Sequence, residues 1–592
     1  MGYIIGVSSG LWGISRQRGA YESLSALGIY RKAMQAITKG VSFIQIDIDN
    51  ISEFNEMDLK EKMEKVKKMG ISYGFHAESA ATGGRSEYVL LDSSIEEDYL
   101  LTHKRLEQTI DKVGEIGGTY IVYHASESPG YLEMGRDLKS TRVVDFFGRP
   151  LHEFIESLPK DIKDKLLDWA IRRVEIMERV WRGRYRASNN FEEAVEKASQ
   201  NIENSLRRGD INVVPPEILE KFRKRAEEIL EEKRKKDPKA ELDENDRNKI
   251  VNELKPFIKS KTEEITKEEF IEDILDFSKR SDLSYGTERV PYLIIAKYME
   301  ITNDKLFKNI VKASISYYSK IENKSEEEFL SSKGIKNVSM DDENFIKEYK
   351  FWIPAVSAKY IWGHFNKDNG KLKNLVKRRN IIIAIETAMG EEEKLRLANP
   401  LHIYYLVKEL GENFSITLDL EHILSANINP EISIDLLPED AGKYIRVIHS
   451  GHPSPLSPAH LRIALGSEEQ MYLYKIYYKL RKKKMGVEND TYIVFERGEE
   501  TEFQESIQSL RIIKEFLEKD VEVEKAFKDP KFFGISAEEF KAIERQEQII
   551  KEHALDPLQG LIVVSEETHG QLGKLALEKG KRPEEWLRER YR

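Results

Sequence analysis

Between residues 381 and 496 the chain reads IIIAIE (381–386), SITLD (415–419), YIRVIH (444–449) and YIVFE (492–496). Each run is short, rich in β-branched residues and bounded by polar or glycine-containing segments, which predicts a buried strand. Stretches of helical character separate the runs, and this alternation is typical of a parallel βα sheet. Each run ends with a glutamate, an aspartate or a histidine. Because a TIM barrel carries its active site at the carboxyl ends of its strands, we predict a metalloenzyme with this fold.

The N-terminal part of the chain repeats this pattern. Four further strand candidates are YIIGVS (3–8), FIQIDI (43–48), ISYGFH (71–76) and TYIVYH (119–124). The last two end at His76 and His124. Helices are expected at about Tyr21–Thr38 and Ile95–Ile116, the second from apolar residues at helical spacing. Together the two parts supply eight strands, the number that closes a (β/α)8 barrel.

One connection is far longer than the roughly 30 to 40 residues that a βα unit needs. It runs from His124 to Glu386. We predict that most of it is a large, mainly helical insertion after the fourth strand, with helical patterns over Leu151–Arg182 and Pro216–Lys236 and breaks at Asp237–Pro238 and 281–287. A closing helix is expected over Phe503–Glu518. The predicted division is 1–130 and 351–518 for the barrel halves, 131–350 for the insertion and 519–592 for a helical C-terminal extension.

Composition excludes several classes of site. Cysteine is absent from the 592 residues, which excludes disulfides, thiolate zinc sites and a cysteine nucleophile. The apolar share of 40% and the charged share of 33% are typical of a globular protein with an ionic surface, and the abundant Lys, Glu and Ile are compatible with a thermophilic source. A net charge of −10 argues against a broadly basic nucleic-acid coat. We find no signal peptide or membrane-spanning run and expect a cytoplasmic protein.

The strand ends and the loops after them supply a set of candidate metal ligands. These are His76, His124, Glu386, Asp419, His422, His449, His460 and Glu496. Buried carboxylates are costly unless they coordinate a cation or form ion pairs, so their positions at equivalent strand ends predict metal binding. Imidazole and carboxylate without thiolate favour zinc first, then manganese or iron.

At this point the sequence resembles the endonuclease IV family, within the larger xylose-isomerase-like TIM-barrel superfamily. Glu386, Asp419, His449 and Glu496 match the ligand quartet of the superfamily. The motifs that match the endonuclease IV branch are FHA (75–77), YHA (123–125), ETAMG (386–390), DLEH (419–422) and HLRIALG (460–466). The resemblance covers roughly residues 1–130 and 375–500.

The resemblance implies a zinc phosphodiesterase that cleaves abasic or modified DNA with metal-activated water. It implies that His76, His124 and Glu386 hold one zinc ion. Glu386 and Glu496, the implied catalytic residues, would hold a second ion with Asp419 and His449. His422 and His460 would belong to a third.

The chain departs from the family in two places. Pro458 stands where the family has an aspartate ligand of the third zinc, and Glu421 and His452 are alternative ligands. The family also wedges bulky side chains into DNA from the loops after strands two and three. Here those loops carry small or acidic residues, at 49–52 and 77–81.

Three functions stay open at this point. Besides the phosphodiesterase, the quartet is compatible with a sugar isomerase or epimerase that uses one divalent ion. A scaffold that works through the insertion and the tail is the third. Within the insertion, cations alternate with aromatic residues at Arg179, Trp181, Arg182, Arg184 and Tyr185. This composition suits nucleic-acid contact, and a helix end with arginines paired to carboxylates is the alternative interpretation.

Overall fold

The structure is a computed structural model. The structure describes residues 2–9, 28–77, 89–126, 142–173, 176, 190–235, 237–279, 289–388, 396–451, 453, 462–496, 503–535, 545–546 and 548. Two compact units are distinguished, Met1–Asp520 and Val521–Arg592. The first unit contains the barrel and the helices between its two halves.

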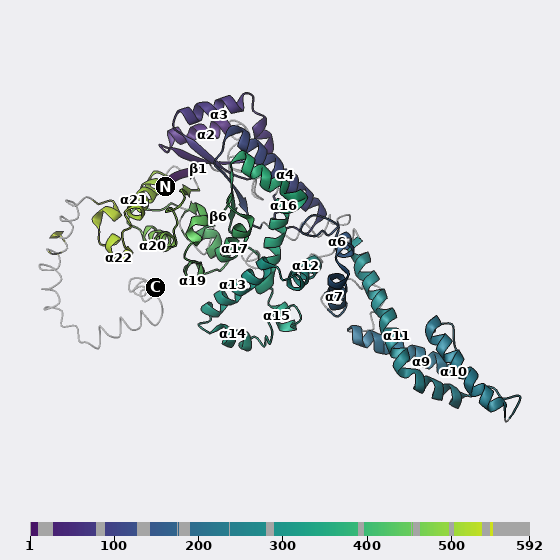
Figure 1. Ribbon diagram of the computed structural model, residues 1–592. Helices are drawn as coiled ribbons and strands as arrows, with labels where there is room; N and C mark the ends of the chain where they lie inside the picture. Colours follow the sequence, from purple (N-terminus) through teal and green to yellow (C-terminus); the bar gives the residue numbers. More distant parts are fainter. Residues whose placement is uncertain are drawn as a thin grey trace, which may run out of the picture. The chain divides into compact units, whose positions relative to one another are not determined.

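Eight parallel strands form a closed barrel in sequence order, with β1 paired to β8. The strands are β1 (Tyr3–Ser8), β2 (Phe43–Asp47), β3 (Ser72–His76), β4 (Tyr120–His124), β5 (Ile382–Glu386), β6 (Phe414–Asp419), β7 (Ile445–Ser450) and β8 (Thr491–Phe495). Figure 1 labels β1 and β6 of this barrel, with helices such as α4 (Glu96–Ile116) and α17 (Pro400–Leu410) beside its strands. All eight predicted strands are present, so the predicted TIM-barrel fold is confirmed. The residues of these strands are almost all buried, as expected where helices cover a parallel sheet.

Aromatic side chains fill part of the barrel interior. Phe43 packs against Tyr492 and Tyr120, with ring centroids 4.5 and 5.7 Å apart. Two glycines make room for these rings. A Cβ atom on Gly74 would lie 2.5 Å from the ring of Tyr120, and one on Gly6 would lie 2.6 Å from the ring of Phe43. The interior is therefore packed as in other barrels of this kind.

Helices alternate with the strands along the barrel. They are α2 (Ile29–Thr38), η1 (Ile51–Asn55), α3 (Leu59–Lys68), α4 (Glu96–Ile116), α17 (Pro400–Leu410), α18 (Leu420–Ser425), α19 (Pro430–Leu436), η5 (Ala441–Tyr444), α20 (Glu468–Lys482) and α21 (Phe503–Glu518). The predicted helices at 95–116 and 503–518 correspond to α4 and α21. Residues 21–27 of the first predicted helix lie outside the described residues, and the described part is α2.

The connection between β4 and β5 is mainly helical. Its helices are α6 (Leu151–Ser157), α7 (Lys160–Ala170), α9 (Phe191–Arg208), α10 (Pro216–Arg234), α11 (Glu244–Lys279), α12 (Arg289–Ile301), α13 (Lys305–Ile321), α14 (Glu326–Ser332), α15 (Glu343–Lys347) and α16 (Tyr349–Arg379). Helices α9, α10 and α11 enclose a hydrophobic core of their own, which includes Leu206, Phe222 and Ile250. The predicted break at Asp237–Pro238 falls between α10 and α11, and the one at 281–287 lies outside the described residues.

Two details of this connection differ from the sequence pattern. The helical pattern over 151–182 is divided into α6 and α7, because Leu158 is extended and Pro159 precedes α7. Helix α16 is broken where Asp368, Asn369 and Gly370 all take left-handed backbone angles. After the break, Arg379 forms an ion pair with Asp111 of α4. The second half of α16 therefore packs on the barrel helix α4.

The second unit has two short described helices, α22 (Val523–Ala526) and η6 (Pro530–Phe533). Most of the predicted helical extension at 519–592 lies outside the described residues. Across the part of the chain that the structure describes, no helix combines the length and the apolar character needed to cross a membrane.

Candidate metal centre

The barrel register brings the predicted ligands to one end of the sheet. His124 on β4 is aligned with Glu386 on β5, and Asp419 on β6 is aligned with His449 on β7. His76 ends β3, and Glu496 directly follows β8. Seven of the eight predicted ligands therefore lie at the carboxyl ends of the strands or, for His422, in the helix that follows β6. His460 lies outside the described residues.

Glu386 is the centre of this cluster and its carboxylate is fully buried. Its Oε2 atom lies 3.1 Å from Nε2 of His76 and 3.2 Å from Nε2 of His124. Its Oε1 atom lies 2.7 Å from Nδ1 of His449 and 3.4 Å from Nδ1 of His422. Each carboxylate oxygen thus faces a different pair of imidazoles. The carboxylate of Glu386 therefore lies at the centre of four imidazoles.

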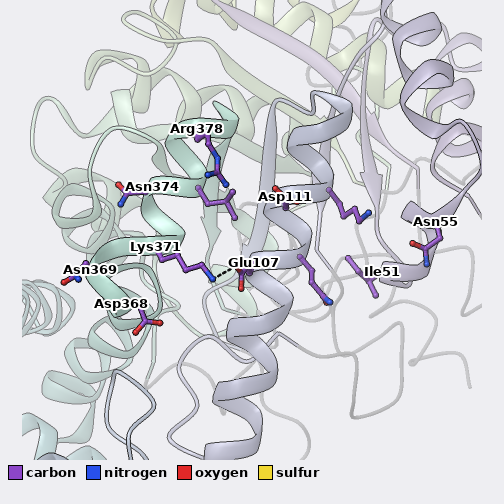
Figure 2. Close-up of a pocket in the computed structure, with 12 residues that line it drawn as sticks. Ile51, Asn55, Glu107, Asp111, Asp368, Asn369, Lys371, Asn374 and Arg378 are labelled. Carbon is purple, nitrogen blue, oxygen red and sulfur yellow. Dashed lines mark ion pairs between the residues drawn. The ribbon is translucent and has the colours of Figure 1, made fainter.

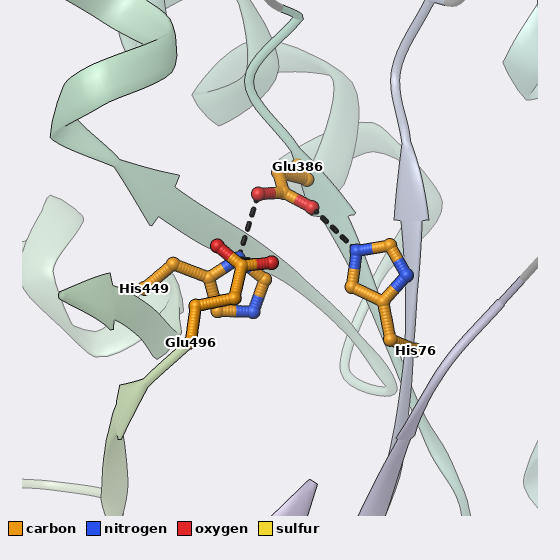
Figure 3. Close-up of side chains that lie close together, drawn as sticks. All are labelled: His76, Glu386, His449 and Glu496. Atoms are coloured by element: carbon orange, nitrogen blue, oxygen red, sulfur yellow. Dashed lines mark hydrogen bonds and ion pairs between the residues drawn. The ribbon is translucent and has the colours of Figure 1, made fainter. Parts of the chain in front are cut away.

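The other two carboxylates gather around His449. Its Nδ1 atom lies 3.4 Å from Oε1 of Glu496 and 3.8 Å from Oδ2 of Asp419. Figure 3 shows Glu386 between His449 and His76, with Glu496 beside His449. Among the described residues, Oδ2 of Asp419 is buried and has no hydrogen-bond partner. A buried carboxylate oxygen of this kind is costly unless a cation binds it.

Hydrogen bonds fix which nitrogen carries the proton in three of the rings, and in His422 it is the Nδ1 atom that also faces Glu386. Nδ1 of His76 donates to the carbonyl of Ala77 at 2.8 Å. Nε2 of His449 donates to Oε1 of Gln45 at 3.0 Å, and Nδ1 of His422 donates to the carbonyl of Thr387 at 3.0 Å. In the neutral rings, the inner nitrogens of His76 and His449 therefore present lone pairs to carboxylate oxygens. Such a contact needs a cation between the two atoms, either a proton or a metal ion.

The electrostatics of the cluster follow from this geometry. Burial disfavours the charged form of His449, but Glu386, Glu496 and Asp419 outweigh it and raise the pKa of its imidazole to about 9. Burial alone would raise the pKa of Glu386, but the imidazoles of His449 and His124 outweigh it and lower that pKa well below its ordinary value. The cluster thus favours anionic carboxylates and attracts positive charge.

The residues fit a metal ion. Two groups have ligand atoms within 4.8 Å of one another, namely His76, Glu386, His449 and Glu496, and His124, Glu386 and His422. Both groups contain Glu386, and both offer only imidazole nitrogen and carboxylate oxygen. The resemblance implied that His422 belongs to a separate third site, whereas here it lies with His124 and Glu386. The buried His and Glu clusters could therefore hold one or more metal ions.

Gln45 was not singled out in the sequence. It lies inside the barrel on β2, and its Oε1 atom accepts from both His449 and the hydroxyl of Tyr120, each at 3.0 Å. In the sequence, the one feature that could have pointed to Gln45 is that it is a polar residue within the apolar strand at 43–48. Its hydrogen bond orients the ring of His449, so Gln45 belongs to the site.

A buried ion pair lies after β2. Nζ of Lys32 donates to Oδ2 of Asp49 at 2.7 Å, to Glu53 at 3.0 Å and to the carbonyl of Asp47 at 2.6 Å. Burial raises the pKa of Asp47 to about 6 and that of Glu53 to about 7. The loop that follows β2 is therefore held by an internal lysine.

Several predicted residues lie outside the described residues. They are His452, Pro458, His460, Arg179, Trp181, Arg182, Arg184 and Tyr185, and the loop residues 78–81. Their roles stay predictions. Glu421, the other alternative ligand for a third site, is buried at the start of α18, next to His422.

A separate pocket of about 740 Å³ lies between α4 and the second half of α16, with η1 at its edge (Figure 2). Its lining residues are Ile51, Asn55, Glu107, Gln108, Asp111, Lys112, Asp368, Asn369, Lys371, Asn374, Leu375 and Arg378. Acidic and basic side chains are mixed here, and Lys371 is paired with Glu107 at 2.7 Å. None of these residues is a predicted ligand, so the pocket is distinct from the metal centre.

Comparisons of the chain with models of protein families, with curated proteins and with solved structures gave no match.

Proposed function

We propose that the protein is a metal-dependent phosphodiesterase of the endonuclease IV type, which cleaves abasic or otherwise modified nucleic acid. The observation that supports it best is the position of Glu386, whose Oε2 atom faces His76 and His124 and whose Oε1 atom faces His449. Two cations held by one carboxylate suit cleavage of a phosphodiester, because charge develops on both the attacking and the leaving oxygen.

The side chains of the metal centre have distinct roles in the proposed reaction. When bound, two divalent ions lower the pKa of a water molecule and neutralise charge on the phosphate. Glu386 would hold both ions, one together with His76 and His124 and the other together with His449 and Asp419. Glu496 is the most exposed of the described candidate ligands, with 16% of its side chain accessible. It is therefore best placed to accept a proton from the attacking water.

The donor set favours zinc. Imidazole nitrogen is the majority ligand, carboxylate oxygen completes the set, and thiolate is absent from the chain. Zinc accepts this mixture at low coordination number, and manganese is the next choice. We propose two zinc ions. A third would need His460 or another residue outside the described ones.

Metal content and cleavage together test this function. Protein purified without chelator or a metal-affinity tag should contain two or three zinc ions per chain by plasma mass spectrometry. It should cleave a duplex oligonucleotide at a single abasic site, and dialysis against a chelator should abolish the cleavage. One ion per chain, with no cleavage of the abasic duplex, would refute the proposal.

A sugar isomerase or epimerase is the second candidate. One observation favours it: Nδ1 of His449 lies within 3.8 Å of oxygens from Glu386, Asp419 and Glu496, the other three members of the single-ion quartet. In this case the two glutamates would move a proton beside the carbonyl of an open-chain sugar. The double variant His76→Ala, His124→Ala separates the candidates. It should abolish phosphodiesterase activity, whereas a single-ion isomerase that does not use these histidines would retain turnover of its aldose or ketose.

A further inference from the structure

Three loops that leave the ligand-bearing strands meet at one polar cluster. Asp92 lies between β3 and α4, Ser126 follows β4, and Arg396 lies between β5 and α17. Nη1 of Arg396 donates to Oδ1 of Asp92 at 3.0 Å and to Oγ of Ser126 at 3.1 Å. Ser126 in turn donates to Oδ2 of Asp92 at 3.0 Å. This closed triangle fixes the position of the guanidinium.

The cluster adjoins the metal centre through the backbone. The amide of Ala125, next to Ser126, donates to the carbonyl of Glu386 at 2.9 Å. The amide of Ala388, two residues after Glu386, donates to the carbonyl of Leu397 at 3.2 Å. Leu397 directly follows Arg396. Ser126 is thus next to a residue that is hydrogen-bonded to Glu386. Arg396 is next to a residue that is hydrogen-bonded to the loop directly after Glu386.

Burial differs between the members of the triangle. Asp92 and Ser126 are almost completely enclosed, whereas 18% of the Arg396 side chain is accessible. Asp92 and Ser126 are thus inside, and Arg396 is the most exposed member of the cluster.

The helices between β4 and β5 support this cluster. The hydroxyl of Tyr292 on α12 donates to the backbone carbonyl of Asp92 at 2.6 Å. The ring of Tyr292 stacks on that of Tyr360 on α16, with centroids 5.5 Å apart. Both tyrosines are buried. The long connection therefore holds the Asp92 loop in place, and through it the guanidinium.

We propose that Arg396 binds the nonbridging phosphoryl oxygens of the substrate beside the metal ions, an inference that rests on the phosphodiesterase function proposed above. A guanidinium is permanently charged and matches the geometry of a phosphate, on which it forms short, charge-assisted hydrogen bonds. Its fixed position means that little conformational freedom is lost when phosphate binds. An uncharged sugar would gain nothing comparable from a fixed cation at this place.

Binding of inorganic phosphate to the zinc-loaded full-length protein tests the proposal without turnover. Titration calorimetry should show binding to the unaltered protein. Arg396→Gln should weaken it by roughly tenfold to one hundredfold, the range for a hydrogen bond to a charged group. Arg396→Lys, which keeps the charge, should weaken it less. The matched control is Arg379→Gln, which removes an arginine paired with Asp111 before the start of β5, at the opposite end of the strand from Glu386.

The outcomes separate this proposal from the function it rests on. Equal phosphate affinity in the unaltered protein and in Arg396→Gln, with equal zinc content, overturns the role of Arg396 even if the protein cleaves abasic DNA. If Arg396→Gln loses zinc but Arg396→Lys keeps it, the test rests on Arg396→Lys. Weaker phosphate binding by Arg396→Lys than by the unaltered protein then supports the role of Arg396, and equal binding overturns it. Dimethyl phosphate should displace inorganic phosphate, and displacement by glucose 6-phosphate alone overturns the assignment to a diester.

Discussion

Replacing Gln45 by leucine tests whether His449 is oriented for metal binding. Gln45 is fully buried, and its Oε1 atom accepts from the ring of His449 and the hydroxyl of Tyr120. Leucine leaves both donors without a partner, at about 1–3 kcal/mol each. Among the described residues, the Nε2 atom of Gln45 has no partner, so its removal returns about 1–3 kcal/mol. The net loss of stability in the metal-free protein should therefore be about 1–3 kcal/mol.

The same substitution should also weaken metal binding, because Gln45 orients a ligating imidazole. Outer hydrogen bonds to a ligating imidazole typically contribute about tenfold to one hundredfold in affinity. We expect Gln45→Leu to weaken zinc binding by that factor, measured by competition with a chromophoric chelator. Thermal unfolding of the metal-free protein gives the stability term separately.

A buried glutamine elsewhere supplies the control. Gln470 on α20 is also fully buried, and its Oε1 atom accepts from the amide of Gly466 at 2.7 Å. Gln470→Leu should lower the melting temperature while leaving zinc affinity unchanged. If Gln45→Leu also binds zinc within twofold of the unaltered protein, then Gln45 does not orient His449 for metal binding.

Three further predictions concern the same barrel. Glu386→Gln should reduce bound zinc from two ions to one or none by plasma mass spectrometry and lower turnover by more than about one hundredfold. Glu203→Gln, a buried glutamate on α9, should change neither, and unchanged metal content in Glu386→Gln would contradict the bridging role. In metal-free protein, the raised pKa of His449 gives stability that is present below about pH 6.5 and is lost as the pH rises through about 9. Melting temperatures between pH 6 and 10 should show this fall, and His449→Gln should flatten it. Gly74→Ala should destabilise the barrel by about 1–3 kcal/mol or more, because its Cβ would meet the Tyr120 ring at 2.5 Å. Urea unfolding measures this loss, and adding Tyr120→Val should recover part of it.

The barrel was predictable because its signal is local. Runs such as those at 381–386 and 492–496 are β-branched and short, and their spacing leaves room for one helix each. The helix breaks were harder to place. Asp368, Asn369 and Gly370 form a turn-like sequence inside a long helical pattern, and they interrupt α16 with left-handed backbone. A periodicity that continues on both sides of such a break conceals it.

The contacts within the site depend on tertiary structure. The sequence shows that Glu386, His76 and His449 end strands, but it cannot show which carboxylate oxygen faces which ring. That depends on the barrel register, which aligns His124 with Glu386 and Asp419 with His449. Gln45 and Lys32 were missed for the same reason. A polar residue in a strand or helix reveals its partner only when the neighbouring strands are in place.

The number of bound ions separates phosphodiester cleavage from sugar isomerisation. The free-energy cost of burying His76 and His124 helps to decide that number. The single-ion quartet of the sugar isomerases, Glu386, Asp419, His449 and Glu496, does not include His76 or His124. Yet both histidines lie at the strand ends with their inner nitrogens about 3 Å from the same oxygen of Glu386. Burying two imidazoles against one carboxylate oxygen is costly unless a shared cation offsets the desolvation. A protein with one ion would be expected to replace at least one of them with an apolar residue. Their joint presence therefore favours a second ion on that oxygen, and with it phosphodiester chemistry.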